Sequence, residues 1–221
     1  MYKQQPNPDV GEIAPRGHYS VCETFVSTQG EGVLSGVVMV FIRFAKCNLR
    51  CSVANTGFDC DTDFQVGRIM TASEIVNEAR ALSPRASWVL LTGGEPALQV
   101  DEALIEGLRA EGFKIAMESN GTTRLRYEVD HLTISPKSAW HTIHQRQCHE
   151  LRIVRSARQA LPSGDVIRDD LLIQADALVL SPGFLASGAL DPEALAWCEQ
   201  LVIDQPEWRL SIQQHKLRGV R

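Results

Sequence analysis

The sequence predicts an α/β fold built on a mainly parallel sheet, and two observations support this prediction. Apolar segments of strand length recur along the 221 residues, and amphipathic helical patterns separate several of them. Alternating strands and helices require right-handed crossover connections, which produce parallel strands. About six such strands are too few for a complete eight-stranded barrel of ~250 residues. The pattern fits an incomplete β/α barrel or an open doubly wound sheet, and periodicity alone does not separate the two.

In the first half of the chain, the apolar segment Val38–Phe44 is the first predicted strand. A capping box at Thr71–Glu74 starts the first predicted helix, because a Thr followed three residues later by a Glu can satisfy the amides of a helix start. Trp88–Thr92 follows as a buried strand. The apolar stripe of that helix has helical spacing and consists of Ile75, Val76, Ala79 and Leu82.

In the second half, a helix over residues 97–111 is predicted to end at Gly112, since glycine is common directly after helices. A strand follows at Lys114–Glu118. Asp191 and Pro192 then begin a helix, because Asp caps helix starts and Pro fits the first turn. Shorter strands are expected at residues 131–135, 150–154, 177–181 and 208–212.

Charge and hydropathy exclude several classes of function. The formal net charge of −5 argues against a role in gripping nucleic-acid phosphates. No apolar run approaches the ~20 residues that a membrane span needs, and Met1–Pro6 lacks the apolar stretch of a secretory signal. We therefore expect a cytoplasmic protein with no nucleic-acid or membrane partner. Residues 1–221 are expected to form one domain, with residues 1–17 as a loose tail.

The six cysteines of the chain fall into two groups. Cys47, Cys51 and Cys60 lie within fourteen residues, shortly after the first predicted strand. A reducing cytoplasm keeps thiols free of disulfides, and close thiolates suit soft metals. The scattered cysteines are expected to be small buried hydrophobic residues instead, and these are Cys22, Cys148 and Cys198.

Three close thiolates are typical of zinc or of an iron–sulfur cluster. A closed structural zinc site would need a fourth ligand, and the nearest candidates, Asp61 and Asp63, are hard oxygen ligands. Iron–sulfur clusters normally take four thiolates, so a cluster held by three leaves one iron with an open position. A second group of residues could in principle bind a metal: His141, His144, Cys148 and His149. Histidines on a polar loop more often face solvent, however, so we do not expect a metal site there.

Polar, turn-prone loops follow four of the predicted strands at their carboxyl ends, where α/β folds place active sites. Cys47 opens the loop after the first strand. The other three loops contain Gly93–Pro96, Ser119–Gly121 and Ser135–Lys137. We expect these four loops to meet at one end of the sheet.

The three cysteines followed by Thr92–Pro96 resemble the radical S-adenosylmethionine (radical SAM) superfamily. Its members ordinarily place three and then two residues between these cysteines, whereas the gaps here are three and eight. Within the superfamily, the chain resembles the 7-carboxy-7-deazaguanine synthase family, which tolerates insertions in the cluster loop. The similarity runs from about residue 20 to the C-terminus. It is carried by Phe25–Gly32, Gly36, Phe41–Arg43, Cys60–Phe64, Glu118–Gly121, Ser135–Lys137 and Trp208–Lys216.

This resemblance implies a partial β/α barrel with a cluster-binding loop after the first strand. It implies a radical SAM carbon–nitrogen lyase that converts 6-carboxy-5,6,7,8-tetrahydropterin to 7-carboxy-7-deazaguanine with loss of ammonia, in queuosine-type 7-deazapurine biosynthesis. The implied cofactors are a 4Fe–4S cluster, S-adenosylmethionine and Mg²⁺. An electron donor such as flavodoxin or ferredoxin is implied as a partner, and a homodimer as the assembly.

The resemblance also implies roles for individual residues. The cluster would be held by Cys47, Cys51 and Cys60, and Mg²⁺ by Thr62. S-adenosylmethionine would contact Phe58, Gly93, Gly94, Glu95, Glu118, Asn120, Ser135, Lys137 and Ser181. The pterin would contact Gln29, Gly30, Glu31, Arg43, Thr92, His215 and Arg221.

Several of these residues also have a purely structural interpretation. Arg43 lies in an apolar strand and should meet a carboxylate, either that of the substrate or that of a structural ion pair. Thr62 is equally typical of a turn. The chain departs from the family at Asp59, where an aromatic residue is usual, and at Ser181, where glutamine is frequent.

Two other functions remain open at the level of sequence. The first keeps the superfamily and changes the substrate, as in an activase that places a glycyl radical on a partner protein. The second is a non-catalytic, metal-stapled or regulatory binding protein that retains the scaffold.

Overall fold

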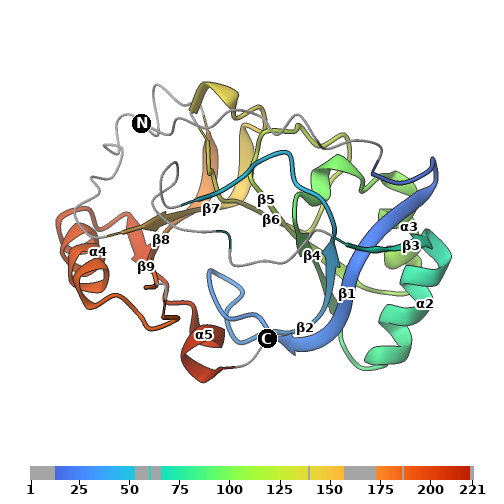
Figure 1. Cartoon of the computed structure of the whole chain (residues 1–221), viewed down its shortest axis with the longest axis horizontal. Helices are drawn as coiled ribbons and strands as arrows, with labels where there is room; N and C mark the ends of the chain where they lie inside the picture. Colours follow the sequence, from blue (N-terminus) through green and yellow to red (C-terminus); the bar gives the residue numbers. More distant parts are fainter. Residues whose placement is uncertain are drawn as a thin grey trace.

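The computed structural model describes residues 13–52, 60, 66–138, 140–156, 173–185 and 187–219. Within them, a curved nine-stranded sheet has the order β3-β1-β2-β4-β5-β6-β7-β8-β9, and Figure 1 shows α2, α3 and α4 along its outer side. The strands are β1 (His18–Thr28), β2 (Val38–Phe44), β3 (Arg68–Thr71), β4 (Trp88–Gly93), β5 (Lys114–Ser119), β6 (His131–Ile134), β7 (Gln147–Arg155), β8 (Gln174–Pro182) and β9 (Trp208–Leu210). The helices are α2 (Ala72–Leu82), α3 (Glu102–Ala110), α4 (Pro192–Asp204) and α5 (Gln214–Arg218), with 3₁₀ turns at Pro96–Leu98 and Trp140–Thr142.

The parallel part of the sheet runs from β2 through β4 and on to β9 in chain order. β1 pairs antiparallel with β2 on one side and with β3 on the other. This mixed α/β sheet confirms the predicted fold class and is consistent with a partial barrel. The carboxyl ends of β2, β4, β5 and β6 lie side by side, which brings their loops together.

The prediction that Val38–Phe44 is the first strand is wrong, because β1 precedes it. β1 buries three successive residues from Tyr19 to Val21, and its register with β2 shifts between Val21 and Glu23. Such a strand lacks the regular alternation that marks a half-buried strand in a sequence. The four-residue β3 was missed as well, because a segment so short carries little pattern.

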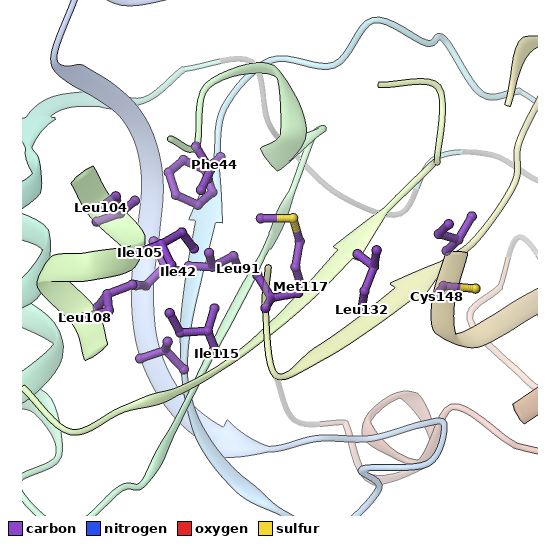
Figure 2. Packing of buried hydrophobic residues seen from close by; sticks show 14 of the residues in the cluster. Ile42, Phe44, Leu91, Leu104, Ile105, Leu108, Ile115, Met117, Leu132 and Cys148 are labelled. Carbon is purple, nitrogen blue, oxygen red and sulfur yellow. The ribbon is translucent and has the colours of Figure 1, made fainter. Parts of the chain in front are cut away.

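The main core fills the space between the sheet and its helices. Ile42, Leu91 and Ile115 come from neighbouring strands and pack towards Leu104 and Leu108 of α3, as Figure 2 shows. On the other face of the same strands, a smaller buried cluster contains Met39, Phe41, Leu90 and Ala116. Because both faces of these strands are buried, their sequences are nearly continuous apolar runs.

Two of the three predicted helix starts are confirmed, those of α2 and α4. Thr71 and Glu74 form the capping box of α2, and Asp191 caps α4 by accepting from two backbone amides. Leu82, predicted to belong to the buried stripe of α2, is instead 43% exposed at the last turn of that helix. The helix expected over residues 97–111 starts later, at Glu102, because the Pro96–Leu98 turn and the capping Asp101 precede it. Gly112 follows α3 with a φ of 80°, as expected for a glycine at a helix end.

Candidate active site

The loops after β2 and β4 are joined backbone to backbone. The amide of Gly94 donates to the carbonyl of Phe44, and the amide of Glu95 donates to that of Lys46, each at 2.9 Å. A Cβ at Gly94 would lie 1.9 Å from the Lys46 oxygen. Glycine at this position is therefore required by the approach of the cysteine loop. Because an ammonium group only donates hydrogen bonds, any backbone contact of this turn with one would use carbonyl oxygens, which accept them.

Glu95 is fully buried beneath these loops. Its carboxylate accepts from the Ser119 hydroxyl at 2.8 Å and from the amides of Asn120 and Ala97 at 2.7 and 3.0 Å. Burial raises the pKa of Glu95 to about 7, although these hydrogen bonds lower it. In the structure this carboxylate ties the loop after β4 to the loop after β5, and its expected contact with S-adenosylmethionine stays a prediction.

Side-chain amides link the cysteine loop to the loop after β5. Asn120 Nδ2 donates to Asn48 Oδ1 at 3.0 Å, and Asn48 Nδ2 donates to the Thr122 hydroxyl at 2.8 Å. Asn120 Nδ2 also lies 4.0 Å from the Cys47 sulfur, which accepts from the Leu49 amide at 3.4 Å. Hydrogen bonds of this kind orient a thiolate and tune a metal bound to it. The sulfur of Cys47 is thus held in a defined direction before any cofactor binds.

Cys47 is buried, Cys51 is half-buried and Cys60 is exposed, and all three are thiols. The pKa of the Cys47 thiol is raised to about 12, mainly by burial; negative charge on Glu95, Cys51 or Cys60 acts in the same direction, and the hydrogen bond from the Leu49 amide opposes it. A thiolate at this place therefore needs a cation beside it, which an iron cluster supplies. Within the described residues no three His, Cys, Asp or Glu side chains converge closely enough to hold a single metal ion. The soft sulfur donors and the oriented Cys47 sulfur are compatible with an iron–sulfur cluster.

The remaining cysteines and the histidines of the second predicted group are placed as follows. Cys148 and Cys198 are buried in the main core, as predicted, whereas Cys22 is only half-buried, so its assignment as a buried hydrophobic residue is wrong. His141 and His144 are exposed. A groove of about 1790 Å³, which His144 and Cys148 help to line, lies at the amino ends of β6, β7 and β8. It is at the opposite end of the strands from the cysteine loop, so we do not assign the chemistry to it.

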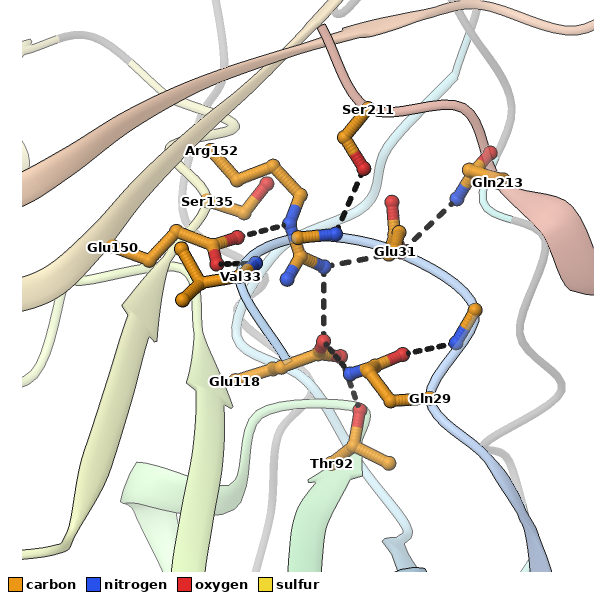
Figure 3. A network of polar contacts seen from close by, with 12 residues as sticks. Gln29, Glu31, Val33, Thr92, Glu118, Ser135, Glu150, Arg152, Ser211 and Gln213 are labelled. Atoms are coloured by element: carbon orange, nitrogen blue, oxygen red, sulfur yellow. Dashed lines mark hydrogen bonds and ion pairs between the residues drawn. The ribbon is translucent and has the colours of Figure 1, made fainter. Parts of the chain in front are cut away.

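A second polar group fills the inner side of the sheet and contains three of the predicted pterin contacts. Glu118 accepts from Gln29 Nε2 at 3.0 Å and from the Thr92 hydroxyl at 3.1 Å (Figure 3). Arg152 Nη1 lies 2.9 Å from Glu118 and 3.1 Å from Glu31. Glu118 was expected to contact the cofactor, but the structure groups it with Gln29, Thr92 and Glu31.

Arg152 and Glu150 form the centre of this group. Arg152 Nε contacts Glu150 at 2.6 Å, and Glu150 accepts from the Val33 amide at 2.6 Å. Burial by itself raises the pKa of Glu150, but its contacts with His131 and Arg152 outweigh burial and hold it at about 2. The neighbouring carboxylates of Glu31, Glu118 and Glu150 raise the pKa of Arg152, although burial opposes this. Both members of the pair are charged at neutral pH.

Arg43 lies beside this group, at the carboxyl end of β2. Its register partner on β4 is Thr92, the residue that donates to Glu118. Arg43 Nε contacts Glu23 at 2.8 Å, and its guanidinium lies 5.7 Å from the centre of the Phe25 ring. The structure therefore contains the structural ion pair that was one of the two interpretations of Arg43. Binding of a substrate carboxylate by the same guanidinium stays a prediction.

The C-terminal segment packs on the loop between β1 and β2. Ser211 Oγ accepts from the Gly32 amide at 2.8 Å, and Gln213 Nε2 donates to Glu31 at 3.2 Å. His215 lies so close to Gly30 that a Cβ there would be 2.3 Å from His215 Nδ1. The structure thus brings His215 next to Gly30 and close to Glu31, two neighbouring residues that are far from it in the sequence.

The other predicted contacts are placed as follows. Lys137 Nζ donates to the Ser135 hydroxyl at 2.5 Å, after β6. Ser181, at the end of β8, is fully buried, and its hydroxyl finds no hydrogen-bond partner among the described residues. Phe58, Thr62 and Arg221 lie outside the described residues, so their roles stay predictions.

Sequence reasoning missed five residues that organise these two groups, namely Asn48, Glu150, Arg152, Ser211 and Gln213. One signal was present for two of them: Glu150 and Arg152 alternate with apolar residues in Glu150–Val154, which places both charges on one face of a strand. Charged residues are almost never buried unless they are paired. That rule could have identified the pair, but not its partners.

Known proteins resemble this chain in sequence and in fold. The family model of the radical SAM superfamily matches residues 41–158, the stretch that contains all three clustered cysteines and the loops after β4, β5 and β6. The fold and the site thus define a radical SAM protein. A 7-carboxy-7-deazaguanine synthase of Bacteroides thetaiotaomicron is 38% identical over 200 residues, which cover 90% of this chain and 97% of that protein. A 7-carboxy-7-deazaguanine synthase of Bradyrhizobium diazoefficiens is 36% identical over 217 residues, which cover 92% of this chain and 99% of that protein.

The chain belongs to the 7-carboxy-7-deazaguanine synthase family of radical SAM lyases. The crystal structure of QueE from Escherichia coli has the same fold, with a TM-score of 0.71, 22% sequence identity, and coverage of 90% of this chain and 95% of that one. Membership implies a 4Fe–4S cluster and S-adenosylmethionine as cofactors, together with a source of electrons. It favours the synthase interpretation over the activase and the non-catalytic scaffold. No helix in the described part of the chain is long and apolar enough to cross a membrane.

Proposed function

We propose that this chain converts 6-carboxy-5,6,7,8-tetrahydropterin to 7-carboxy-7-deazaguanine with loss of ammonia. The observation that carries the proposal is the polar group around Glu118, which faces the same end of the sheet as the cysteine loop. It combines acceptors from Glu31, Glu118 and Gln29 with the guanidinium of Arg43. A pterin ring offers several N–H donors at one edge and, in this substrate, a carboxylate elsewhere. The two sets of groups are complementary.

Glu31 supports recognition of the pterin edge. Its Oε1 faces Arg152 and Gln213, whereas its Oε2 is buried and has no hydrogen-bond partner among the described residues. A buried acceptor without a donor is costly, so a ligand that supplies an N–H at this place is favoured. We assign the amino and amide edge of the pterin to Glu31 and Gln29.

Arg43 supports recognition of the substrate carboxylate. A guanidinium can bind a carboxylate through two parallel hydrogen bonds, which fixes direction as well as distance. Glu23 and the Phe25 ring orient this guanidinium at the end of β2. Thr92 joins the two ends of the site, since it is level with Arg43 on the neighbouring strand and donates to Glu118. The chain would thereby bind the pterin at two places: Glu31 and Gln29 at its amino and amide edge, and Arg43 at its carboxylate.

The cysteine loop and the loops next to it would hold the cofactors. Cys47, Cys51 and Cys60 would bind the cluster, and the turn Gly93–Glu95 would face S-adenosylmethionine. When bound, these cofactors supply an electron and a radical that removes hydrogen from the substrate. The chain itself contributes position and exclusion of water. Mg²⁺, with Thr62 as a ligand, belongs to the same proposal.

Two partners complete the proposal. The cluster must be reduced by an electron donor such as flavodoxin or ferredoxin. We also propose a homodimer, the commonest assembly of soluble enzymes.

The decisive experiment is anaerobic turnover by the reconstituted protein. The protein is incubated with S-adenosylmethionine, dithionite, Mg²⁺ and the carboxytetrahydropterin, and products are separated by mass spectrometry. Formation of 7-carboxy-7-deazaguanine and ammonia in equal amounts is the expected result. A protein that carries a full cluster and cleaves S-adenosylmethionine, yet yields no deazapurine, would refute the proposed substrate.

A matched pair of cysteine variants controls for the cofactor. Cys51→Ala should lose the cluster absorbance and all turnover, because only two thiolates would remain. Cys198→Ala removes a buried thiol of α4 in the main core and should keep both. Equal turnover by the two variants would contradict the assignment of the cluster ligands.

A further inference from the structure

Arg152 is the one point at which three separate parts of the described site meet. Its side chain is 5% exposed and contacts Glu31 from the β1–β2 loop, Glu118 from β5 and Glu150 from β7. Nη1 reaches both Glu31 and Glu118, at 3.1 and 2.9 Å, so one nitrogen sets the spacing between these two carboxylates. Figure 3 shows the guanidinium lying between them.

Three carboxylates contact the one guanidinium of Arg152, and His131 Nε2 lies 3.7 Å from Glu150. Like charges held this close in a buried place repel one another unless a cation lies between them. Without the guanidinium, the side chains of Glu31 and Glu118 would move apart, and the spacing of their acceptors would be lost.

The β1–β2 loop also rests directly on the ion pair. A Cβ at Gly32, whose φ is 73°, would lie 2.4 Å from Arg152 Nη2 and from Glu150 Oε1. The next amide, that of Val33, donates to Glu150 Oε2. The backbone between Gln29 and Val33 is therefore fixed to β7 by contacts that need both Arg152 and Glu150.

We propose that Arg152 is the positioning residue of the pterin pocket, which holds the carboxylates of Glu31 and Glu118 at a fixed separation before the substrate binds. This inference rests on the proposed function, because it assigns the pterin edge to these two carboxylates. It gives Arg152 no contact with the substrate. The pocket is pre-organised by this cation, so that binding need not order the loop at the same time.

The test compares Arg152→Lys and Arg152→Met with the matched control Arg155→Lys. Arg155 is also buried and on β7, and its Nη1 donates to the carbonyl of Val154. Hydrogen–deuterium exchange of the unloaded protein reports on the loop at residues 29–33. Steady-state kinetics of the loaded enzyme separate KM for the pterin from kcat.

We expect Arg152→Met to raise KM about 10- to 100-fold with a smaller fall in kcat, because one charge-assisted contact to each acceptor is lost. Arg152→Lys should recover part of this loss, since an ammonium keeps the charge but not the fork of donors. The amide hydrogen of Val33 should exchange faster in both Arg152 variants than in Arg155→Lys. If Arg152→Met does not fold, Arg152→Lys tests the proposal by itself. The expected result is then a KM for the pterin that is raised at least 3-fold at nearly unchanged kcat.

An unchanged KM for Arg152→Lys, or a fall in kcat alone, would overturn the inference. Failure of the proposed function is recognised separately, since the wild-type enzyme would then form no deazapurine. In that case the exchange measurement still tests whether Arg152 holds the loop, and equal exchange at Val33 in Arg152→Lys and Arg155→Lys would reject it.

Discussion

Two buried carboxylates, Glu95 and Glu150, hold the two halves of the site together, and their surroundings are opposite. Glu95 joins the loops after β4 and β5 and accepts only from neutral groups, namely two amides and one hydroxyl. Glu150 joins β7 to the β1–β2 loop and faces a guanidinium. Burial raises the pKa of Glu95 to about 7, whereas Arg152 and His131 hold that of Glu150 at about 2. Burial alone thus does not fix the charge of a carboxylate, because the partner decides it.

The half of the site around Glu95, which we propose to hold the cofactors and call the cofactor half, is therefore held together by backbone and neutral hydrogen bonds. The half around Glu150 and Arg152, which we propose to hold the pterin and call the pterin half, is held together by ionic contacts between distant elements. The first arrangement follows from loops at the ends of adjacent strands, and the second needs the whole sheet to close around Arg152. Four experiments test this difference, and they are taken from the largest expected effect to the smallest.

Glu150→Ala should cost about 3–5 kcal/mol of unfolding free energy, because removing one member of a buried ion pair leaves the other uncompensated. Urea unfolding of the unloaded protein measures this. The control is Glu78→Ala, which removes the ion pair with the exposed Arg68 and a hydrogen bond from the Thr24 hydroxyl at a half-buried position, and should cost about 1 kcal/mol. Equal costs for the two variants would show that the Glu150 pair is not desolvated.

Glu95 should make stability depend on pH in the range from about 4.5 to 7. Its folded pKa is raised above the unfolded value, so its contribution is fully present below the unfolded pKa and is lost as the pH rises through about 7. The loss is on the order of 3 kcal/mol. For Glu150 the sign is opposite: its contribution is present above the unfolded pKa and is lost as the pH falls towards about 2. Comparing wild type with Glu95→Gln between pH 4.5 and 8 isolates the first effect, and a constant difference over this range would exclude it.

Gly94→Ala should push the cysteine loop away, since the new Cβ would overlap the Lys46 carbonyl. We expect a loss of about 1–3 kcal/mol of stability. Because the displaced backbone precedes Cys47, iron content after reconstitution should fall as well. Gly112→Ala is the control: nothing lies within 4 Å of the added Cβ, so any cost there comes from the positive φ of 80° and not from a steric overlap. A Gly94→Ala protein with wild-type iron content would show that the loop contact does not position the cluster ligands.

Asn48→Ala should have the smallest effect, about 1 kcal/mol, because it removes neutral hydrogen bonds to Thr122 and Asn120. Thermal unfolding of the unloaded protein measures this loss against Asn77→Ala, an exposed change on α2. A loss above 3 kcal/mol would mean that the cofactor half depends on side chains as strongly as the pterin half does.

Much of the fold could be predicted because its signals are local. The capping residues Thr71 and Asp191, the apolar runs of β2, β4 and β5, and the glycine after α3 each depend on neighbouring residues only. The bulged β1 and the short β3 were missed because their pairing, not their pattern, makes them strands. The loops that carry Cys47, Gly94 and Asn120 could be placed together, since parallel strands put their carboxyl ends on one edge.

The sequence by itself determined the α/β class, the cysteine loop, the family resemblance and the residues at the ends of four strands, because spacing along the chain encodes each of these. Only the tertiary structure decided that Arg43 pairs with Glu23, that Glu118 belongs with Gln29 and Thr92, and that Arg152 gathers three carboxylates. Apart from Arg152–Glu150, these contacts join residues from 20 to more than 100 positions apart. Their energies depend on burial and on the distances between charges, which exist only after the sheet has closed.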